Sequence, residues 1–247
     1  MMRWLQRHWD ARAAANFVLG GAGSGLLVCV ALADIRDVSA VGLALALVAL
    51  GLGAVWLEIG RKLRALHVLF NPFTSWMTRE SYAALLLFPL GVASIYVPAA
   101  ATLAAVAAAL FLYCQARILR ASKGIPAWRA SEVVPLVVLT GLAEGAGLAL
   151  FFSESTVLQA AFAIAVVARY LAWRRYRAAA PSAVLEAPGK ALVWVGTVAA
   201  LALLPFMLPL AGVAALVTGG WLKLAVVTRA SINQGFALPH LPVRGAR

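Results

Sequence analysis

Five polar side chains stand out because they interrupt, adjoin or follow the long apolar stretches of this 247-residue chain. Asn16 and Glu144 lie within apolar stretches, Tyr113 and Gln115 lie near the end of another, and His67 lies between two of them. Polar groups among membrane-length runs of apolar residues are costly to bury and are usually functional. His67 could donate or accept a proton near neutral pH, and Asn16 and Tyr113 could each hydrogen-bond a polar ligand.

Glu144 lies in the middle of a glycine-rich run from Gly141 to Gly147. A carboxyl group at this depth in an apolar helix could form half of a proton path. It could equally be a protonated, hydrogen-bonded structural acid, and the sequence leaves both roles open.

The segment from Glu58 to Glu80 is the densest polar region and adds Trp76, Arg79 and Glu80 as candidate site residues. It is too polar to cross a membrane, yet four apolar residues recur at helical spacing, namely Leu63, Leu66, Leu69 and Phe70. This pattern predicts a short helix at the membrane interface that ends near Asn71-Pro72.

The next helix should begin near the end of this segment. Ser75 or Thr78 would cap its N-terminus, and Glu80 would lie in its first turn. In a less specific interpretation, His67, Trp76 and Arg79 are ordinary anchors at the membrane interface.

The composition indicates that the elements carrying these residues cross a membrane. The chain is 64% hydrophobic and 12% charged, whereas a soluble domain carries about a quarter charged residues. No stretch alternates as barrel strands do, so the spans must be helices. We predict an all-α integral membrane protein with eight transmembrane helices, at about residues 13–33, 41–58, 81–97, 99–116, 132–152, 155–173, 190–208 and 210–228.

The basic residues predict the orientation of these helices. Twenty of the 21 Lys and Arg residues fall on the side that holds both termini and the longer loops, and the twenty include Arg169 and Lys223. The other side carries only Asp34, Arg36, Asp37 and Glu154. Because positive loops stay inside, both termini should be cytoplasmic and the membrane the inner one.

This topology divides a single membrane domain into four parts. They are a cytoplasmic N-terminus (1–12), the first four helices with their loops (13–130), the last four helices (131–229) and a cytoplasmic tail (230–247). The two sets of four helices could form two four-helix bundles.

Several function classes are excluded by position and count. The net charge of +12 comes from short loops that set topology, which argues against nucleic-acid binding. His8 and His240 lie in terminal segments, so His67 alone could ligate haem, and a bis-histidine haem needs two. Cys29 and Cys114 lie singly in apolar stretches, so we expect no zinc or iron–sulfur site and no metal in this chain.

A small-residue spacing in the first apolar stretch predicts close helix packing. Gly21 and Gly25 are four residues apart within the run Gly20-Gly21-Ala22-Gly23-Ser24-Gly25. Such spacing lets the backbone of a second helix approach closely within a membrane.

Four segments together resemble a known family, the NrfD-type membrane anchors of molybdenum and tungsten oxidoreductases, which include the polysulfide reductase and DMSO reductase anchors. They are Trp9-Asp10-Ala11-Arg12-Ala13-Ala14-Ala15-Asn16-Phe17 with the glycines to Gly25, Arg61-Lys62-Leu63-Arg64-Ala65-Leu66-His67, Asn71-Pro72-Phe73-Thr74-Ser75-Trp76-Met77-Thr78-Arg79-Glu80, and Ile125-Pro126-Ala127-Trp128-Arg129. The Thr-Ser-Trp-Met-x-Arg-Glu core is the most specific. The resemblance covers the first 130 residues, and the rest only by span count and hydrophobicity.

The resemblance implies a haem-free, eight-helix anchor that binds ubiquinone or menaquinone near a docked iron–sulfur subunit. That four-cluster, ferredoxin-like subunit would connect to a catalytic molybdopterin subunit, so this chain would hold no catalytic residue for the substrate. By position in the family, the quinone contacts would be Asn16, His67 and Tyr113. Arg79 and Glu80 would order the loop or dock the partner, and Trp76 belongs to the same motif.

The predicted orientation places both partner subunits on the cytoplasmic side. The opening segment is similar to anchors labelled phenylacetyl-CoA:acceptor oxidoreductase, and a CoA thioester is a cytoplasmic substrate. The alternatives are the anchor of a cytoplasmic sulfite dehydrogenase, a small secondary transporter with Glu144 and His67 as its proton-coupled pair, and a purely structural anchor without a quinone site.

Overall fold

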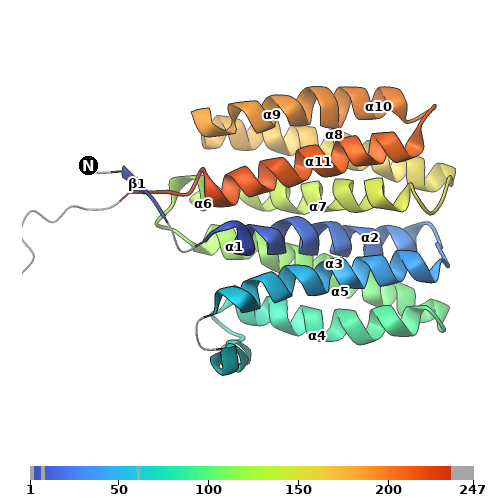
Figure 1. Ribbon diagram of the computed structural model, residues 1–247, viewed down its shortest axis with the longest axis horizontal. Coiled ribbons are helices and arrows are strands. Elements are labelled where there is room, and N and C mark those ends of the chain that lie inside the picture. Colours follow the sequence, from blue (N-terminus) through green and yellow to red (C-terminus); the bar gives the residue numbers. More distant parts are fainter. Residues whose placement is uncertain (1–2, 7–8, 60–61, 235–247) are drawn as a thin grey trace, which may run out of the picture.

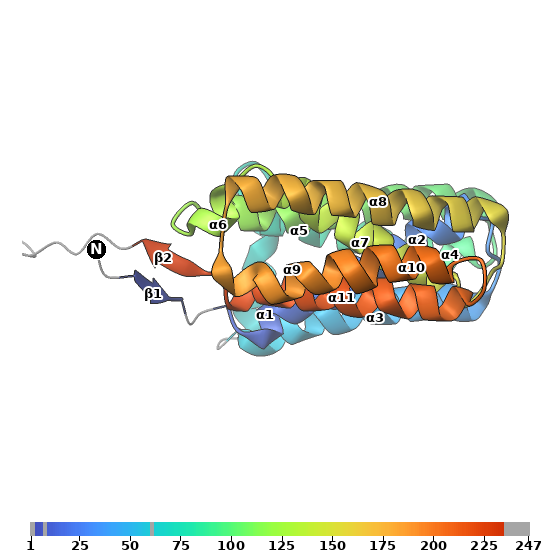
Figure 2. The ribbon, with the colours of Figure 1, turned by 90° about the horizontal axis from the view of Figure 1, so that it is seen from above.

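The computed structural model describes residues 3–6, 9–59 and 62–234. Its long helices run side by side along one axis (Figures 1 and 2). Within the described residues, the only strands are β1 (Arg3–Leu5) and β2 (Ile232–Gln234), which pair antiparallel with Leu5 opposite Ile232. The first and last described segments therefore meet at the same end of the bundle.

The first half of the chain contributes four long helical segments and one short helix. The first long segment, Ala11–Leu32, is continuous and comprises α1 (Ala11–Ala15), the π-helical turn η1 (Asn16–Gly20) and α2 (Gly21–Leu32). The others are α3 (Val38–Glu58), the 3-10 helix η2 (Lys62–Phe70), α4 (Trp76–Ser94) and α5 (Pro98–Ala121).

The second half also contains four long helical segments. It comprises α6 (Pro126–Arg129), α7 (Val133–Ala149), α8 (Thr156–Ala179), η3 (Ala183–Leu185), α9 (Glu186–Val193), the π-helical turn η4 (Trp194–Ala199), α10 (Ala200–Leu203) and α11 (Leu208–Thr228). The elements from η3 to α10 form one continuous segment, Ala183–Leu203.

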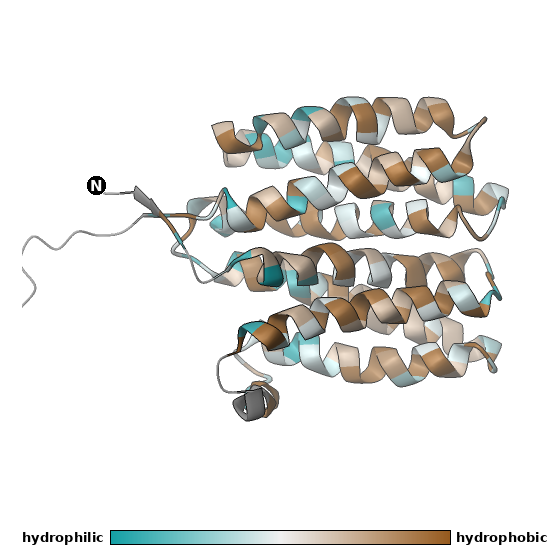
Figure 3. Cartoon of the chain, in the orientation of Figure 1, coloured by the Kyte–Doolittle hydropathy of each residue, from teal (hydrophilic) through white to brown (hydrophobic). Residues whose placement is uncertain are grey.

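Six of the described helices are long and apolar enough to cross a membrane, which gives the chain the character of a multi-pass membrane protein. They are Ala11–Leu32, Val38–Glu58, Pro98–Ala121, Thr156–Ala179, Ala183–Leu203 and Leu208–Thr228. Helix α7 is apolar but has 17 residues, and α4 is not among the six. Figure 3 shows apolar residues along most of the length of the bundle. Each of the eight predicted spans coincides with a helical segment, and length and composition support six as spans.

Local sequence signals explain where the helices begin. Asp10 and Asp37 cap α1 and α3, each accepting a hydrogen bond from the backbone N–H two residues further on. Ser75 caps α4 by accepting from the N–H of Thr78. Ser75 is thus the cap, and the predicted short helix before Asn71 is confirmed as η2. Pro98 stands at the first position of α5, where its missing N–H costs nothing.

The two halves meet where α2 packs against α7. Gly25 faces Gly141 and Gly145, and a Cβ atom added to Gly25 would overlap the carbonyl group of Gly141. The close approach predicted from the Gly21-x-x-x-Gly25 spacing is confirmed at Gly25. A small residue on each helix permits this distance, so the backbones of α2 and α7 can pack closely where the two halves meet.

Two of the twenty basic residues assigned to the loop side are inside the bundle instead. Arg169 lies within α8 and Lys223 within α11, and their side chains are 0% and 3% exposed. The assignment of both to the basic loop side was wrong because each has buried polar partners that hold it within its helix. Arg7, Arg61, Arg244 and Arg247, together with His8 and His240, lie outside the described residues.

Candidate functional site

A cavity of about 270 Å³ opens at the end of the bundle that carries β1 and β2. Its walls come from the start of the first helix, the end of α3, the first turns of α4 and the last turns of α5. The lining is apolar apart from Asn16, Glu58 and Glu80. A mainly apolar cavity with a few convergent polar groups is the usual form of a small-molecule site.

Asn16 and Glu80 are joined by a buried hydrogen-bond network. Asn16 Nδ2 donates to Glu80 Oε1 over 2.9 Å. Gln115 Nε2, from α5, donates to the backbone O of Asn16 over 2.8 Å and to Asn16 Oδ1 over 3.1 Å. All three side chains are at most 5% exposed, and Gln115 Oε1 has no partner within the described structure. Three helices thus hold these two cavity residues in one orientation.

The π-helical turn η1 explains why the backbone of Asn16 is available to Gln115. A π turn replaces the usual i→i+4 bonding pattern with i→i+5, so backbone carbonyls are displaced from their regular partners. Side chains from outside the helix bond three of the carbonyls: Gln115 bonds that of Asn16, and Lys223 Nζ bonds those of Phe17 over 2.6 Å and Val18 over 3.3 Å. Asn16 and Phe17 line the cavity, and Lys223 belongs to α11. The turn η1 therefore connects the cavity to α11.

Lys223 also forms a buried ion pair with the predicted site residue Glu144, with Nζ and Oε2 separated by 2.5 Å. Arg169 lies close enough to interact electrostatically with both. Its Nη1 donates to the carbonyl of Ala215 over 2.8 Å, and its Nη2 to that of Gly196, in the π turn η4, over 2.5 Å. Glu144 Oε1 and Arg169 Nε have no partner among the described residues. When all three groups are ionised, the cluster has one negative and two positive charges.

Trp76, Arg79 and Tyr113 meet in a third group, together with Arg117. The guanidinium carbons of Arg79 and Arg117 lie 4.1 and 4.2 Å from the centroid of the Trp76 ring. Arg117 Nη1 donates to Tyr113 Oη over 2.7 Å, and the Tyr113 ring lies edge-on to Trp76 with centroids 5.8 Å apart.

Arg79 has a structural task as well, because it ties the turn before α4 to the helix. Its Nε donates to the carbonyl of Pro72 over 2.8 Å and its Nη2 to that of Phe73 over 2.7 Å. This agrees with the expectation that Arg79 orders the loop.

The structure separates His67 from these groups. His67 lies on η2 with an exposed side chain, contacts the ring of Phe70 and does not line the cavity. Of the predicted residues, Asn16 and Glu80 therefore meet in the cavity, and Trp76, Arg79 and Tyr113 meet beside it on α4 and α5. Glu144 lies deeper, with Lys223.

Three residues of these groups were not singled out from the sequence, namely Arg117, Arg169 and Lys223, whereas Gln115 was noted beside Tyr113 without a role of its own. A signal was available for two of them. Lys223 is the only charged residue within Leu208–Thr228, and Arg169 interrupts the apolar run at the start of α8. Charged residues inside apolar spans are expensive, so both positions indicated a buried partner.

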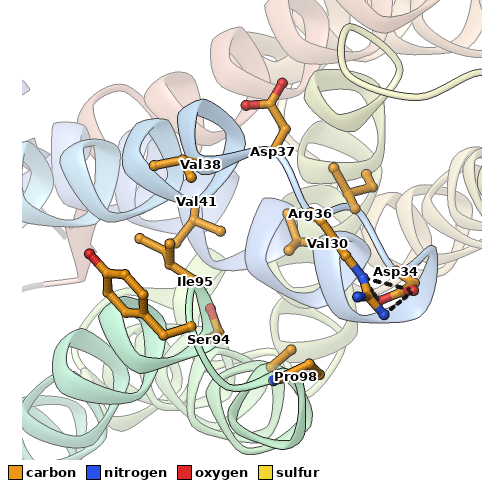
Figure 4. A pocket seen from close by; sticks show the side chains of 12 residues that line it. Val30, Asp34, Arg36, Asp37, Val38, Val41, Ser94, Ile95 and Pro98 are labelled. Atoms are coloured by element: carbon orange, nitrogen blue, oxygen red, sulfur yellow. Dashed lines mark hydrogen bonds and ion pairs between the residues drawn. The ribbon is translucent and has the colours of Figure 1, made fainter.

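The opposite end of the bundle has a smaller cavity of about 150 Å³ (Figure 4). It lies between the α2–α3 and α4–α5 connections, and its charged side chains already have partners. Arg36 pairs with Asp34 over 3.1 Å, and hydrogen bonds from Ser39 lower the pKa of the Asp37 carboxyl group. These are the contacts of a surface ion pair and a helix cap, and they indicate a structural role.

No group of three His, Cys, Asp or Glu residues in the described part of the chain is arranged to hold a metal ion. Cys29 and Cys114 are buried and free. No model of a known protein family matches the chain, and no curated protein matches it.

Proposed function

We propose that this chain is the haem-free, quinone-reactive membrane anchor of a molybdenum or tungsten iron–sulfur oxidoreductase complex. The observation that carries the proposal is the cavity in which the Asn16 amide and the Glu80 carboxyl group meet among apolar walls. A quinone combines an apolar ring and tail with two carbonyl oxygens, so it needs an apolar cavity and a few fixed polar groups. The resemblance of the first 130 residues to NrfD-type anchors supports the same ligand.

The chemistry assigned to the cavity is the conversion of a quinone to a quinol. A bound quinone would take up two electrons, one at a time, from an iron–sulfur cluster of the partner subunit, and one proton would have to reach each quinone oxygen, because a dianion would be costly in an apolar site. Asn16 Nδ2 is the donor placed to hold one quinone oxygen. Glu80, at 2.9 Å from that amide, is the group placed to pass a proton. Gln115 keeps the Asn16 amide in position.

The other predicted residues take supporting roles in this proposal. Trp76 and Arg79 fix the start of α4, which carries Glu80, and Tyr113 orders Arg117 on α5. His67 has no assigned contact with the quinone because it lies outside the cavity.

In the proposed topology, eight helices span the inner membrane and both termini lie in the cytoplasm. Eight long helical segments and the basic residues near the β1–β2 end support it. The cavity would then open on the cytoplasmic side, where a ferredoxin-like iron–sulfur subunit and a molybdopterin subunit would dock. Such a complex would act on a cytoplasmic substrate, such as phenylacetyl-CoA or, as the alternative, sulfite.

A small proton-coupled transporter is the second candidate, and the buried Glu144–Lys223–Arg169 cluster is the observation that favours it. Ionisable groups at this depth mark proton and ion paths in membrane proteins. Transporters usually have broken helices in matched positions of their two halves, but the glycine-rich run Gly141–Gly147 lies within the continuous helix α7. The two π turns are also unmatched, because η1 lies in the first long segment of the first half and η4 in the third long segment of the second half. The helix arrangement therefore lacks the paired breaks that are typical of transporters.

The experiment that tests the proposed function is purification of the tagged chain in mild detergent, followed by identification of co-purifying proteins and extraction of bound quinone. An iron–sulfur subunit, a molybdopterin subunit and a quinone are expected with the wild type. Asn16→Leu should lose the quinone, and Glu80→Gln should bind it but reduce it far more slowly. Ser81→Ala, next to Glu80 and outside the cavity, is the matched control. Recovery of the chain alone and without quinone would favour the transporter.

A further inference from the structure

The Arg79–Trp76–Arg117 group carries positive charge that no described carboxylate neutralises. All nine Asp and Glu residues lie in the described ranges, and none forms an ion pair with Arg79 or Arg117. Only one nitrogen of Arg117 donates to a described acceptor, and its buried Nε has no partner. Two guanidinium groups within 4.2 Å of one indole centroid are expected to attract an anion from outside the chain.

The surface below this group is apolar and continuous. Leu103, Val106, Leu110 and Tyr113 are 38–62% exposed and recur every three or four residues, so they form one stripe along α5 that ends one turn before Arg117. At a rise of about 1.5 Å per residue, the stripe is about 15 Å long. That length matches half of a hydrocarbon core that is about 30 Å thick, which is one leaflet.

From these features we infer that Arg79 and Arg117 hold the phosphate group of an anionic phospholipid, one of whose acyl chains lies along the α5 stripe. Arg117 lies about 6 Å along the helix axis beyond Tyr113, at the level where a lipid phosphate meets the hydrocarbon boundary. The exposed rings of Phe70 and Phe73 near the start of α4 suit the same boundary. The first-turn N–H groups of α4, which begins at Trp76, favour an anion there.

A lipid fits these observations better than an acidic partner protein does. One phospholipid supplies both the anion and the apolar chain that the stripe requires, whereas an acidic protein surface would leave the stripe to other lipids. Each donor that Arg117 adds to a phosphate is a charge-assisted hydrogen bond, which is about twice as strong as a neutral one. The inference does not depend on quinone binding.

The test is a lipid titration followed by native mass spectrometry. The full chain, purified in mild detergent and stripped of lipid, is titrated with dioleoyl phosphatidylglycerol and, separately, with dioleoyl phosphatidylcholine. The wild type should bind one phosphatidylglycerol in preference to phosphatidylcholine, and excess inorganic phosphate should not displace it. Arg117→Gln should weaken that binding by roughly tenfold or more. Arg120→Gln, on the same helix and exposed, is the matched control and should bind like the wild type.

Each contrary result overturns the assignment. Equal affinity in the wild type and Arg117→Gln would show that the lipid binds elsewhere, and equal loss in Arg120→Gln would show only general attraction to positive charge. Displacement by inorganic phosphate would identify a free-anion site. Unchanged lipid binding together with loss of a co-purifying acidic protein would assign the group to protein docking. Arg117→Lys keeps the charge and should recover part of the affinity, which separates a binding defect from a folding defect.

Discussion

The buried Glu144–Lys223–Arg169 cluster leads to a prediction in which the two members of one ion pair differ in importance. The cluster carries a net charge of +1 when all three groups are ionised. Glu144→Gln would leave two buried cations and a net charge of +2, whereas Lys223→Met would leave Glu144 and Arg169 with a net charge of zero. Glu144→Gln should therefore be the more destabilising substitution.

The expected magnitudes follow from the contacts. Removing one partner of a buried ion pair costs about 3–5 kcal/mol, and Glu144→Gln should fall in this range. Lys223→Met should cost about 1–3 kcal/mol, chiefly because the carbonyls of Phe17 and Val18 lose their donor. The double variant returns the cluster to +1, with Arg169 still bonded to the carbonyls of Ala215 and Gly196. It should be more stable than the sum of the single changes predicts, by about 1 kcal/mol or more.

The assay is equilibrium unfolding of the purified chain in mixed detergent micelles, with the exposed Arg174→Gln variant as the control. The free energies of unfolding of the four proteins form a double-mutant cycle. The reasoning fails if Glu144→Gln lies within 1 kcal/mol of the wild type, or if Lys223→Met is the more damaging change.

Three further predictions concern the fold. Gly25→Ala should destabilise the chain by about 1–3 kcal/mol because its Cβ would overlap α7. Gly53→Ala, at a position with open space, should be neutral or slightly stabilising in the same unfolding assay, and equal effects would contradict the packing argument. Ser75→Ala should cost about 1 kcal/mol through loss of the α4 cap, and no change in thermal stability would show that water replaces the cap. Hydrogen bonds lower the pKa of Asp37 below its ordinary value of 3.8. The carboxylate should therefore stabilise the fold fully at pH values above 3.8, and this stabilisation should be lost as the pH falls through the lower pKa of the folded protein. The stability difference between the wild type and Asp37→Asn should therefore shrink in acid, and a constant difference between pH 6 and pH 3 would refute the cap.

The helices were predictable because their signals are local. Long apolar runs, Ser75 before α4 and the proline at the start of α5 each act within a few residues, and the structure follows them. The spacing of small residues predicted that another helix would pack closely at Gly25. It could not say which helix, because the spacing carries no information about the partner.

The candidate site was only partly predictable because its contacts are long-range. Asn16 meets Glu80 across 64 positions and Glu144 meets Lys223 across 79. Hydropathy alone assigned Lys223 and Arg169 to the loop side, because the buried carboxylate and carbonyl groups that retain them come from other helices. His67 was expected beside Asn16, but no periodic pattern in the sequence says where η2 lies relative to the first helix.

The turn η1 connects the two buried polar groups, and this connection has a functional consequence. Asn16 and Phe17 line the cavity, while the carbonyls of Phe17 and Val18 accept from Lys223, so the ion pair helps to hold the π turn that presents Asn16. If the cavity binds quinone, Lys223→Met should weaken quinone binding several-fold although Lys223 does not line the cavity. Arg174→Gln should leave that affinity unchanged. A folded Lys223→Met protein with wild-type affinity would show that η1 keeps its shape without Lys223, whereas absence of quinone binding in the wild type would refute the quinone assignment itself.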